Sequence, residues 1–496
     1  MRLQNADIGM PKYPTIAGRV IEAGVYALLT AFFLCVGFIS TFGALDTITA
    51  AIKALGVLLL LLAMIYALYR FEPHSRALIA GILVLAAVLR IGDIFAVPTS
   101  PVSDFAVLYN AACSTANGDV SWMNVAEGYF SWWQYQIPFV LYEAAIIKLT
   151  HSVAALKLLN VVWSVGIVYM VYCIAGLYMP RRASLIASAL CAVYPGHILM
   201  SSVLTNQHIS LFFILIGVYV CLRADSLLKY AASGLLLAVG DMMRPEAGIV
   251  VAAIICVCLL AAIGRPTKKR ILWIVYCSLR CLLQLAVLIA AYLGAKKLTE
   301  LALQSVGLAP YGIGNSVPEW KLIVGLNMEN NGALDDKYLY VLNITDVARR
   351  TEEAQRIIRA HLSQHGWGKF FYQKLKYFWT FPEDLTFTLA GVNEWDMAFG
   401  RVNITYTIYE VVFVERIIRA LCYLSAAVGC AVLARDAITR QSKDRGTASI
   451  LTAAIMCGTV VAYLLVEIQQ RYRFFAIPFL LMLAAYPFKI KIQHKK

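Results

Sequence analysis

Residues 77–97 read ALIAGILVLAAVLRIGDIFAV, an apolar run interrupted only by Arg90 and Asp93. A run of this length can cross the hydrocarbon core of a bilayer, about 30 Å thick, as a single helix. Because no water is available there, the segment must close its own backbone hydrogen bonds. We interpret Arg90 and Asp93, three positions apart, as a structural pair that faces other helices.

Similar runs recur through the whole chain, which is 60% hydrophobic and only 15% charged. A soluble globule of 496 residues would need a much larger charged surface. We therefore predict an all-α polytopic membrane protein with about twelve transmembrane helices. The expected spans are 20–43, 48–69, 77–97, 154–178, 183–200, 207–224, 227–243, 246–263, 271–295, 409–434, 448–466 and 474–489.

The formal net charge is +14, and the Lys and Arg residues gather in short segments between apolar runs. Short loops of this kind lie on the cytoplasmic side of a membrane. We therefore interpret the charge as a topology signal and do not expect nucleic-acid binding. With the N-terminus inside, every short inside segment is basic and both termini are cytoplasmic; these segments are 70–76, 181–182, 223–229, 265–270, 435–445 and 489–496.

The apolar stretch 137–149 is an exception to this pattern. It is too short to span, carries Glu143 and follows Trp122, Trp132 and Trp133, which is typical of a helix in the membrane interface. Two large outer loops remain. The first, 98–153, is expected to hold interfacial helices, and the second, 296–408, is expected to be mainly helical.

Two helices are predicted within the second outer loop. Segment 346–365 is amphipathic, and segment 367–379 mixes aromatic residues with lysines, as an interfacial helix does. The buried stripe of the first is expected to be Val347, Ala354, Ile357, Ile358 and Leu362. The lysines of the second, expected to reach lipid phosphates, are Lys369, Lys374 and Lys376.

These boundaries divide the chain into four parts. Residues 1–76 form an N-terminal two-span addition, and 77–295 form a seven-span module that includes the outer loop 98–153. Residues 296–408 are the large extracytoplasmic loop, and 409–496 form a three-span segment with a basic cytoplasmic tail.

Asp104 lies in the sequence PVSDFAVLY, residues 101–109, directly after the third span. The prolines at 98 and 101 end the membrane helix, and Ser103 or Asp104 can cap a new one. The alternative is that Asp104 is a general base, since a carboxylate at the membrane surface can accept a proton from a bound hydroxyl.

Arg244 lies in the outer turn DMMRPE, residues 241–246, and opposes the usual charge pattern of outer loops. One interpretation is an internal ion pair with Asp241 or Glu246. The other is a fork of donors that binds a lipid phosphate.

The outer turn EIQQRYR, residues 467–473, also carries cations, against the usual charge pattern of outer loops. Arg471 and Arg473 are candidates for holding an anionic headgroup, with Tyr472 and Glu467 beside them. Anchoring at the interface is the alternative. A further turn contributes weaker candidates for binding a polar ligand, which are His197, Asn206 and His208.

All these groups fall on the same face of the predicted topology, which was fixed from other residues. The shared face implies an outward-facing site, walled by membrane helices, that holds an anion at the level of the lipid headgroups.

The pattern resembles the C-type (GT-C) integral-membrane glycosyltransferases, which include protein mannosyltransferases and bacterial lipid A aminoarabinose transferases. The resemblance covers about 77–295 and the last outer turn. It rests on the motif at 101–112, the sequence YPGH at 194–197, Arg244-Pro-Glu246, and residues 467–472. The order of these motifs and their shared side are more specific than any one of them.

The resemblance implies an inverting transfer of a hexosyl or pentosyl group from a polyprenyl-phosphate donor to an acceptor hydroxyl. Asp104 would be the base, and Arg244 and Arg471 would hold the departing phosphate. The acceptor would be a glycan, a lipid or a protein. The expected location is a bacterial cytoplasmic membrane with the site facing outward.

Many members of this family carry a second acid near the first-loop aspartate, where this chain has Ser103. A single carboxylate is a poor Mg²⁺ or Mn²⁺ site, so we expect no firm metal site and leave dependence on a divalent metal open. Tyr109 and Glu127 remain weaker candidates for binding the donor or the acceptor. Glu127 can contribute only if the first outer loop folds back toward Asp104. The absence of any Cys-x-x-Cys pair argues against zinc.

Two other functions remain open at this point. An O-antigen-ligase-like or polymerase-like transferase of lipid-linked glycans would also need outer arginines, with a histidine more central than Asp104. A transporter or lipid flippase would be typically built from repeats with polar groups at mid-membrane, and the sequence displays neither.

Overall fold

The computed structural model describes residues 16–71, 74–124, 128–263, 271–381, 388, 391–392, 404–439 and 447–489. Helices dominate these residues, and no strand occurs among them. Seven helices are long and apolar enough to cross a membrane, judged by length and composition. They lie in α1 (Ile16–Ala44), α2 (Ile48–Arg70), α3 (Ser75–Ala96), α7 (Val153–Ala175), α13 (Ile271–Ser305), α18 (Ile404–Thr439) and α19 (Thr447–Leu465). The predicted all-α polytopic membrane fold is confirmed.

A helix occupies each of the twelve segments predicted to span. The remaining five are shorter or less apolar, so the number twelve stays a prediction. They are α8 (Arg181–Val193), α10 (Gln207–Leu222), α11 (Leu227–Met243), α12 (Ala247–Ile263) and α20 (Ile477–Ala485).

The expected span 183–200 is not one continuous helix. It divides into α8 and the short α9 (Pro195–Leu199), and Tyr194 between them has an extended backbone, φ −69° and ψ 114°. Pro195 has no N–H to continue the ladder and disfavours a helical residue before it. The break turns the chain toward α10 at one end of the helix bundle.

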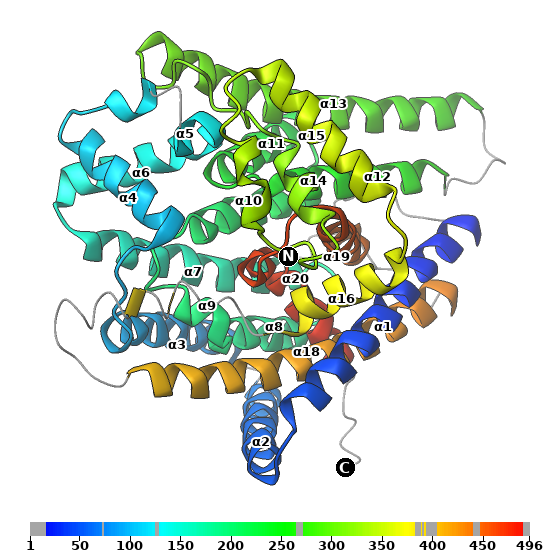
Figure 1. Cartoon of the computed structure of the whole chain (residues 1–496). Coiled ribbons are helices and arrows are strands. Elements are labelled where there is room, and N and C mark those ends of the chain that lie inside the picture. The colour runs from blue at the N-terminus through cyan, green and yellow to red at the C-terminus, as the bar shows by residue number, and fades with distance from the viewer. Residues whose placement is uncertain are drawn as a thin grey trace, which may run out of the picture.

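The last helix forms the centre of the molecule. Every residue of α20 is buried, and the helix packs against α18, α8 and α19. Figure 1 shows α20 surrounded by other helices, with α1 running alongside α18. By contrast, α2 projects from the bundle and exposes apolar residues such as Leu59 and Leu60, as a helix bordered by lipid does.

Arg90 does face the bundle, as predicted, but Asp93 is not its ion-pair partner. The Arg90 side chain is fully buried and donates from Nε to Ser164 Oγ at 2.6 Å. Its Nη atoms donate to the carbonyls of Ala192 and Cys191 at 2.9 and 3.2 Å. The arginine therefore joins α3 to α7 and to the end of α8.

The first large loop contains α4 (Ser103–Ala116), α5 (Tyr129–Trp132) and α6 (Ile137–Thr150). Helix α6 forms where the sequence predicted a helix that does not span. It packs against α4 and α7, and Glu143 on its inner face is buried.

The second large loop holds α14 (Trp320–Gly325), α15 (Val347–Leu362) and α16 (Trp367–Thr380), so its described part is largely helical. The predicted stripe of α15 is partly wrong. Ala354 and Ile357 are buried, but Val347 and Leu362 are exposed. Arg350 and His361 complete the buried face instead, because each has a polar partner in the loop: Arg350 donates to Ser316 O and His361 bonds to the Tyr338 hydroxyl.

Helix α16 contradicts one expectation for its lysines. Lys374 does not reach toward lipid phosphates, since its side chain is 1% exposed. Its ammonium donates to the backbone carbonyls of Gly325, Leu464 and Val466. These carbonyls provide the polar partners that a buried ammonium needs.

Candidate functional site

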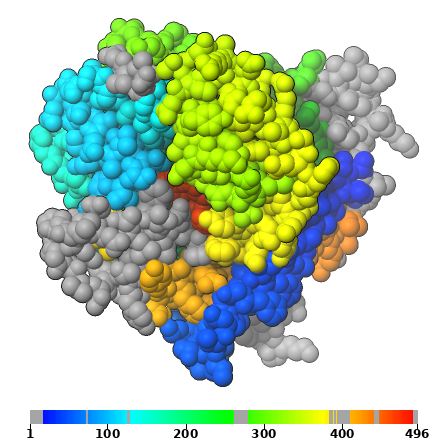
Figure 2. Space-filling view, viewed as in Figure 1, coloured from blue at the N-terminus to red at the C-terminus, as the bar shows by residue number. Residues whose placement is uncertain are grey.

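A cavity of about 790 Å³ opens between the two large loops and the ends of several helices. In Figure 2 the red C-terminal segment is visible between the cyan first loop and the yellow-green second loop. Seven of the candidate site residues named from the sequence line this cavity: Asp104, Asn206, Arg244, Glu246, Glu467, Arg471 and Tyr472.

Asp104 lies in the first turn of α4 and does not act as its cap. The N-cap is Val102, without a side-chain cap hydrogen bond. Ser103 takes the left-handed backbone conformation, φ +51°, which is uncommon outside glycine. The Asp104 carboxylate instead accepts from Arg471 Nη2 at 3.3 Å, and its side chain is 44% exposed. The capping interpretation is therefore wrong, and the carboxylate is accessible from the cavity.

Arg471 comes from the 3-10 helix η5 (Gln470–Phe475) that leads into α20. Its side chain is only 5% exposed. Nε donates to Gln469 Oε1 at 2.6 Å, and the backbone carbonyl accepts from Gln207 Nε2 at 2.7 Å. These contacts fix the guanidinium beside Asp104, with its Cζ 5.0 Å from the centre of the Phe105 ring.

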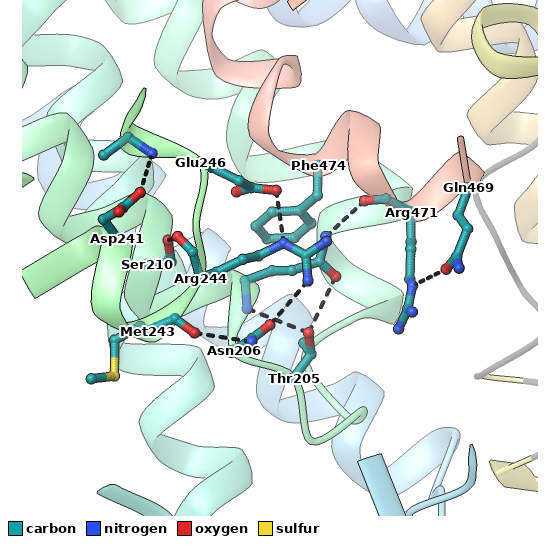
Figure 3. Close-up of polar contacts among 12 residues, drawn as sticks. Thr205, Asn206, Ser210, Asp241, Met243, Arg244, Glu246, Gln469, Arg471 and Phe474 are labelled. Atoms are coloured by element: carbon teal, nitrogen blue, oxygen red, sulfur yellow. Dashed lines mark hydrogen bonds and ion pairs between the residues drawn. The ribbon is translucent and has the colours of Figure 1, made fainter. Parts of the chain in front are cut away.

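Arg244 forms the internal pair of the first interpretation and also lines the cavity. Its Nε donates to Glu246 Oε1 at 2.7 Å, so the internal pair exists. Its Nη1 donates to Asn206 Oδ1 at 3.2 Å, and the residue lines the cavity. Figure 3 shows Arg244 extended between Glu246 and Asn206. Asp241, the other predicted partner, pairs with Lys296 instead.

Lys321 is a cavity residue that the sequence did not reveal. It belongs to α14 of the second large loop and forms an ion pair with Glu467. Burial alone would raise the pKa of Glu467, but the Lys321 ammonium, the Gln469 hydrogen bond and the Arg471 charge together hold that pKa below its usual range. Gln469 Nε2 also donates to Glu467 at 2.8 Å. The pair therefore stays ionised at neutral pH.

The ring of Tyr472 lies at the centre of these charges. Arg244 Cζ is 4.9 Å from the ring centre, Lys321 Nζ 5.6 Å and Arg471 Cζ 5.6 Å. A cation within about 6 Å of an aromatic face is attracted to its electron density. Three cations from three distant parts of the chain thus converge on one aromatic ring, each balanced by one carboxylate.

Several predicted residues lie outside the cavity. Arg473 is fully buried and donates to the carbonyls of Phe378 and Phe381, so we withdraw it as a donor-binding candidate. His197 stacks on Phe474 with ring centres 3.9 Å apart and bonds to the Phe474 carbonyl. His208 is fully buried against the same ring. Both histidines are packing residues.

Two weaker candidates from the first large loop remain. Tyr109 lies further along α4 and is not among the residues that line the cavity. Burial raises its pKa to about 12, which makes the phenol a poor proton acceptor. Glu127 lies outside the described residues.

Several residues that the sequence missed are aromatic or amide side chains of the two large loops. Gln136 accepts from Asn206 Nδ2 at 3.1 Å, which ties the first loop to the Arg244 cluster. No periodicity or charge pattern marks such positions. The other missed residues at the cavity are Tyr129, Trp132, Trp133, Tyr135, Lys296, Lys297, Glu300, Trp320, Tyr463 and Gln469.

The donor set around Asp104 does not suit a divalent cation. Mg²⁺ prefers several oxygen ligands, which include one or two carboxylates, and the Asp104 carboxylate already pairs with Arg471. Glu246 and Glu467 each pair with their own cation. Among the described residues no group of three or more His, Cys, Asp or Glu side chains is placed to hold a metal ion. No step proposed below uses a metal.

No family model matches the chain, and no curated protein matches it. Among solved structures the chain is similar to the apo crystal structure of the oligosaccharyltransferase of Archaeoglobus fulgidus. The identity is 15% and the TM-score 0.42, over 82% of this chain and 50% of that one. The chain thus spans about half the length of that protein. The long apolar helices of this chain identify it as a polytopic α-helical membrane protein.

Proposed function

We propose that the chain is a membrane glycosyltransferase of the GT-C type, acting at the extracytoplasmic face of a membrane. It moves a sugar from a polyprenyl-phosphate donor to an acceptor hydroxyl. The observation that carries the proposal is the meeting of one accessible carboxylate, Asp104, with three cations around Tyr472 in a single cavity.

The cations provide the phosphate side of the site. Arginine presents planar, directed donors that match phosphate oxygens, and lysine adds a point charge. Arg244, Lys321 and Arg471 all border the cavity, so the donor phosphate would meet cations from the turn after α11, from α14 and from η5. Leu293 of the long apolar helix α13 lines the same cavity, and an isoprenoid tail would pack against this side of it.

Asp104 provides the proton acceptor. The acceptor hydroxyl gives its proton to the Asp104 carboxylate while its oxygen attacks the anomeric carbon opposite the phosphate. The bond between that carbon and the phosphate oxygen breaks, and its electron pair stays on the phosphate. The cations stabilise the charge that grows there, and the sugar leaves with inverted configuration.

The positions of other residues weigh against the two alternatives. A ligase-like mechanism relies on a central histidine, whereas His208 is buried behind Phe474. A transporter would gather charge along its membrane path. Here the paired charges of the cavity lie in turns, in loops and at helix ends.

The test uses the purified full chain and a panel of polyprenyl-phosphate sugars. We expect one panel member to raise the apparent melting temperature and to yield free polyprenyl phosphate. Arg471→Gln should lower that release about 10²-fold, the usual effect of removing one donor to a developing oxyanion. Arg435→Gln, whose side chain is 62% exposed at a distance from the cavity, is the matched control.

Two results would contradict the proposal. One is equal release by Arg471→Gln and Arg435→Gln. The other is movement of a labelled donor across proteoliposomes with no sugar released from any panel member, which would favour a flippase.

A further inference from the structure

A second cavity, of about 320 Å³, adjoins the first. It lies between residues 128–134 of the first large loop and residues 311–316 and 342–350 of the second. Trp132 and Leu342 line both cavities. A molecule bound in the second cavity therefore lies next to the cavity that Asp104 lines.

Direct hydrogen bonds hold the two loops together along this cavity. The Ser316 N–H donates to the Trp132 carbonyl at 3.3 Å. The Ser316 hydroxyl donates to Gln134 Oε1 at 2.8 Å. Within the first loop, Ser131 Oγ donates to the Gly128 carbonyl at 2.7 Å. The cavity is therefore a feature of the joined loops, and its shape is fixed by both.

The polar lining is neutral. It consists of hydroxyl and amide side chains, and none of its residues is acidic. The one cation, Arg350, is buried and donates to the carbonyls of Ser316 and Ile344 at 3.1 and 3.4 Å, so it supports the loop. The side chains of Asn343 and Thr345 make no hydrogen bond within the described part of the chain, and both are exposed. They remain able to donate to and accept from a ligand.

Apolar and aromatic surfaces complete the lining. At this cavity Tyr311 is 58% exposed and Val347 is 62% exposed. Val347 therefore does not belong to the buried stripe that was predicted for α15. Trp132 presents part of its ring. A ligand site of this type combines aromatic faces with a few uncharged polar groups. Sugar rings have the matching surfaces, with C–H groups on their faces and hydroxyls on their edges.

We propose that this second cavity binds a carbohydrate acceptor and holds its reactive hydroxyl toward Asp104. The inference rests on the proposed glycosyltransferase function and names the acceptor class and its site. Tyr311 and Trp132 contact sugar faces, while Asn343, Thr345 and Gln134 bind hydroxyls. Arg244, Lys321 and Arg471 line the first cavity and not the second, so donor and acceptor occupy adjoining cavities.

The test measures binding of four neutral tetrasaccharides, based on mannose, glucose in α and β linkage, and N-acetylglucosamine, to the detergent-purified full chain. Saturation-transfer NMR reports contact and affinity. We expect at least one to bind and its Kd to rise tenfold or more in Tyr311→Ala/Asn343→Ala. The control is Tyr372→Ala, which removes a half-exposed tyrosine of α16 that lines neither cavity.

Three outcomes would overturn the acceptor site: no tetrasaccharide binds, the double variant binds as tightly as the control, or unglycosylated tetrapeptides compete for the same contacts. Hydrolysis of polyprenyl-phosphate sugar by the wild-type chain needs no acceptor and is measured in parallel. Hydrolysis without sugar binding rejects the acceptor site alone, whereas absence of hydrolysis with every donor rejects the proposed function.

Discussion

Of the residues outside the cavity, Lys374 is the one whose substitution we expect to lower the stability of the folded chain most. Its buried ammonium donates to Gly325 O, to Leu464 O at 3.0 Å and to Val466 O at 2.8 Å. Val466 directly precedes Glu467, and the Glu467 N–H donates to the Lys321 carbonyl at 2.9 Å. Lys374 therefore stabilises the two backbone segments that carry Lys321 and Glu467.

Lys374→Met keeps the length of the side chain but removes every donor. A buried carbonyl left without a partner costs about 1–3 kcal/mol, and three carbonyls are affected. Part of that loss is offset because an ammonium no longer has to be desolvated. We expect a net loss of about 2–4 kcal/mol, concentrated at the junction of α14 with the end of α19.

The assay combines thermal unfolding in detergent with hydrogen exchange. Lys374→Met should unfold at a lower temperature and lose protection at residues 464–468 and 325–332. In Lys374→Ala, ethylammonium added to the buffer should restore part of this protection by occupying the carbonyl site. Lys369→Met, an exposed lysine of the same helix, serves as the control. Equal stability and equal protection in the Lys374 and Lys369 variants would refute the reasoning.

Two further predictions concern buried positions near the cavity. Burial raises the pKa of Glu143 to about 8, whereas the unfolded chain releases this proton near pH 4.5. The stability that the protonated carboxyl contributes is therefore complete below pH 4.5 and is lost as the pH rises through 8. Glu143→Gln should therefore flatten the decline of melting temperature between pH 5 and 9, and an unchanged decline would contradict it. Gly325→Ala would place a Cβ 2.3 Å from Leu465 O and 2.6 Å from Glu467 N. We expect a loss of about 1–3 kcal/mol in unfolding experiments, against none for Gly314→Ala, which has open space; equal stability of the two variants would show that the backbone yields there.

The sequence alone was sufficient to identify the candidate residues that lie at the ends of helices. Asp104 follows two prolines, and Arg244 precedes Pro245, so both positions are readable as turns. Arg244 and Arg471 also stand out because cations are unusual in outer turns. The short length of the apolar stretch 137–149, with Glu143 in it, predicted α6 as a helix that does not span.

Other residues depend on contacts that a sequence does not display. Arg471 and Arg473 are two positions apart, and only the path of η5 decides that one faces the cavity and the other the core. Lys374 has the pattern of an interfacial lysine, but three distant carbonyls accept its ammonium. Lys321 enters the cavity because the second large loop folds back over the turn that carries Glu467.

The central claim is that Asp104 accepts the proton of the acceptor hydroxyl while the cations hold the donor. Its most direct test is Asp104→Asn, measured for donor binding and for sugar transfer in the same preparation. Asp119→Asn is the matched control, because Asp119 is a surface carboxylate of the same loop whose partner is the backbone N–H of Ser121. We expect Asp104→Asn to bind donor within about threefold of wild type and to transfer sugar about 10²–10⁴-fold more slowly. Transfer at the rate of Asp119→Asn would contradict it.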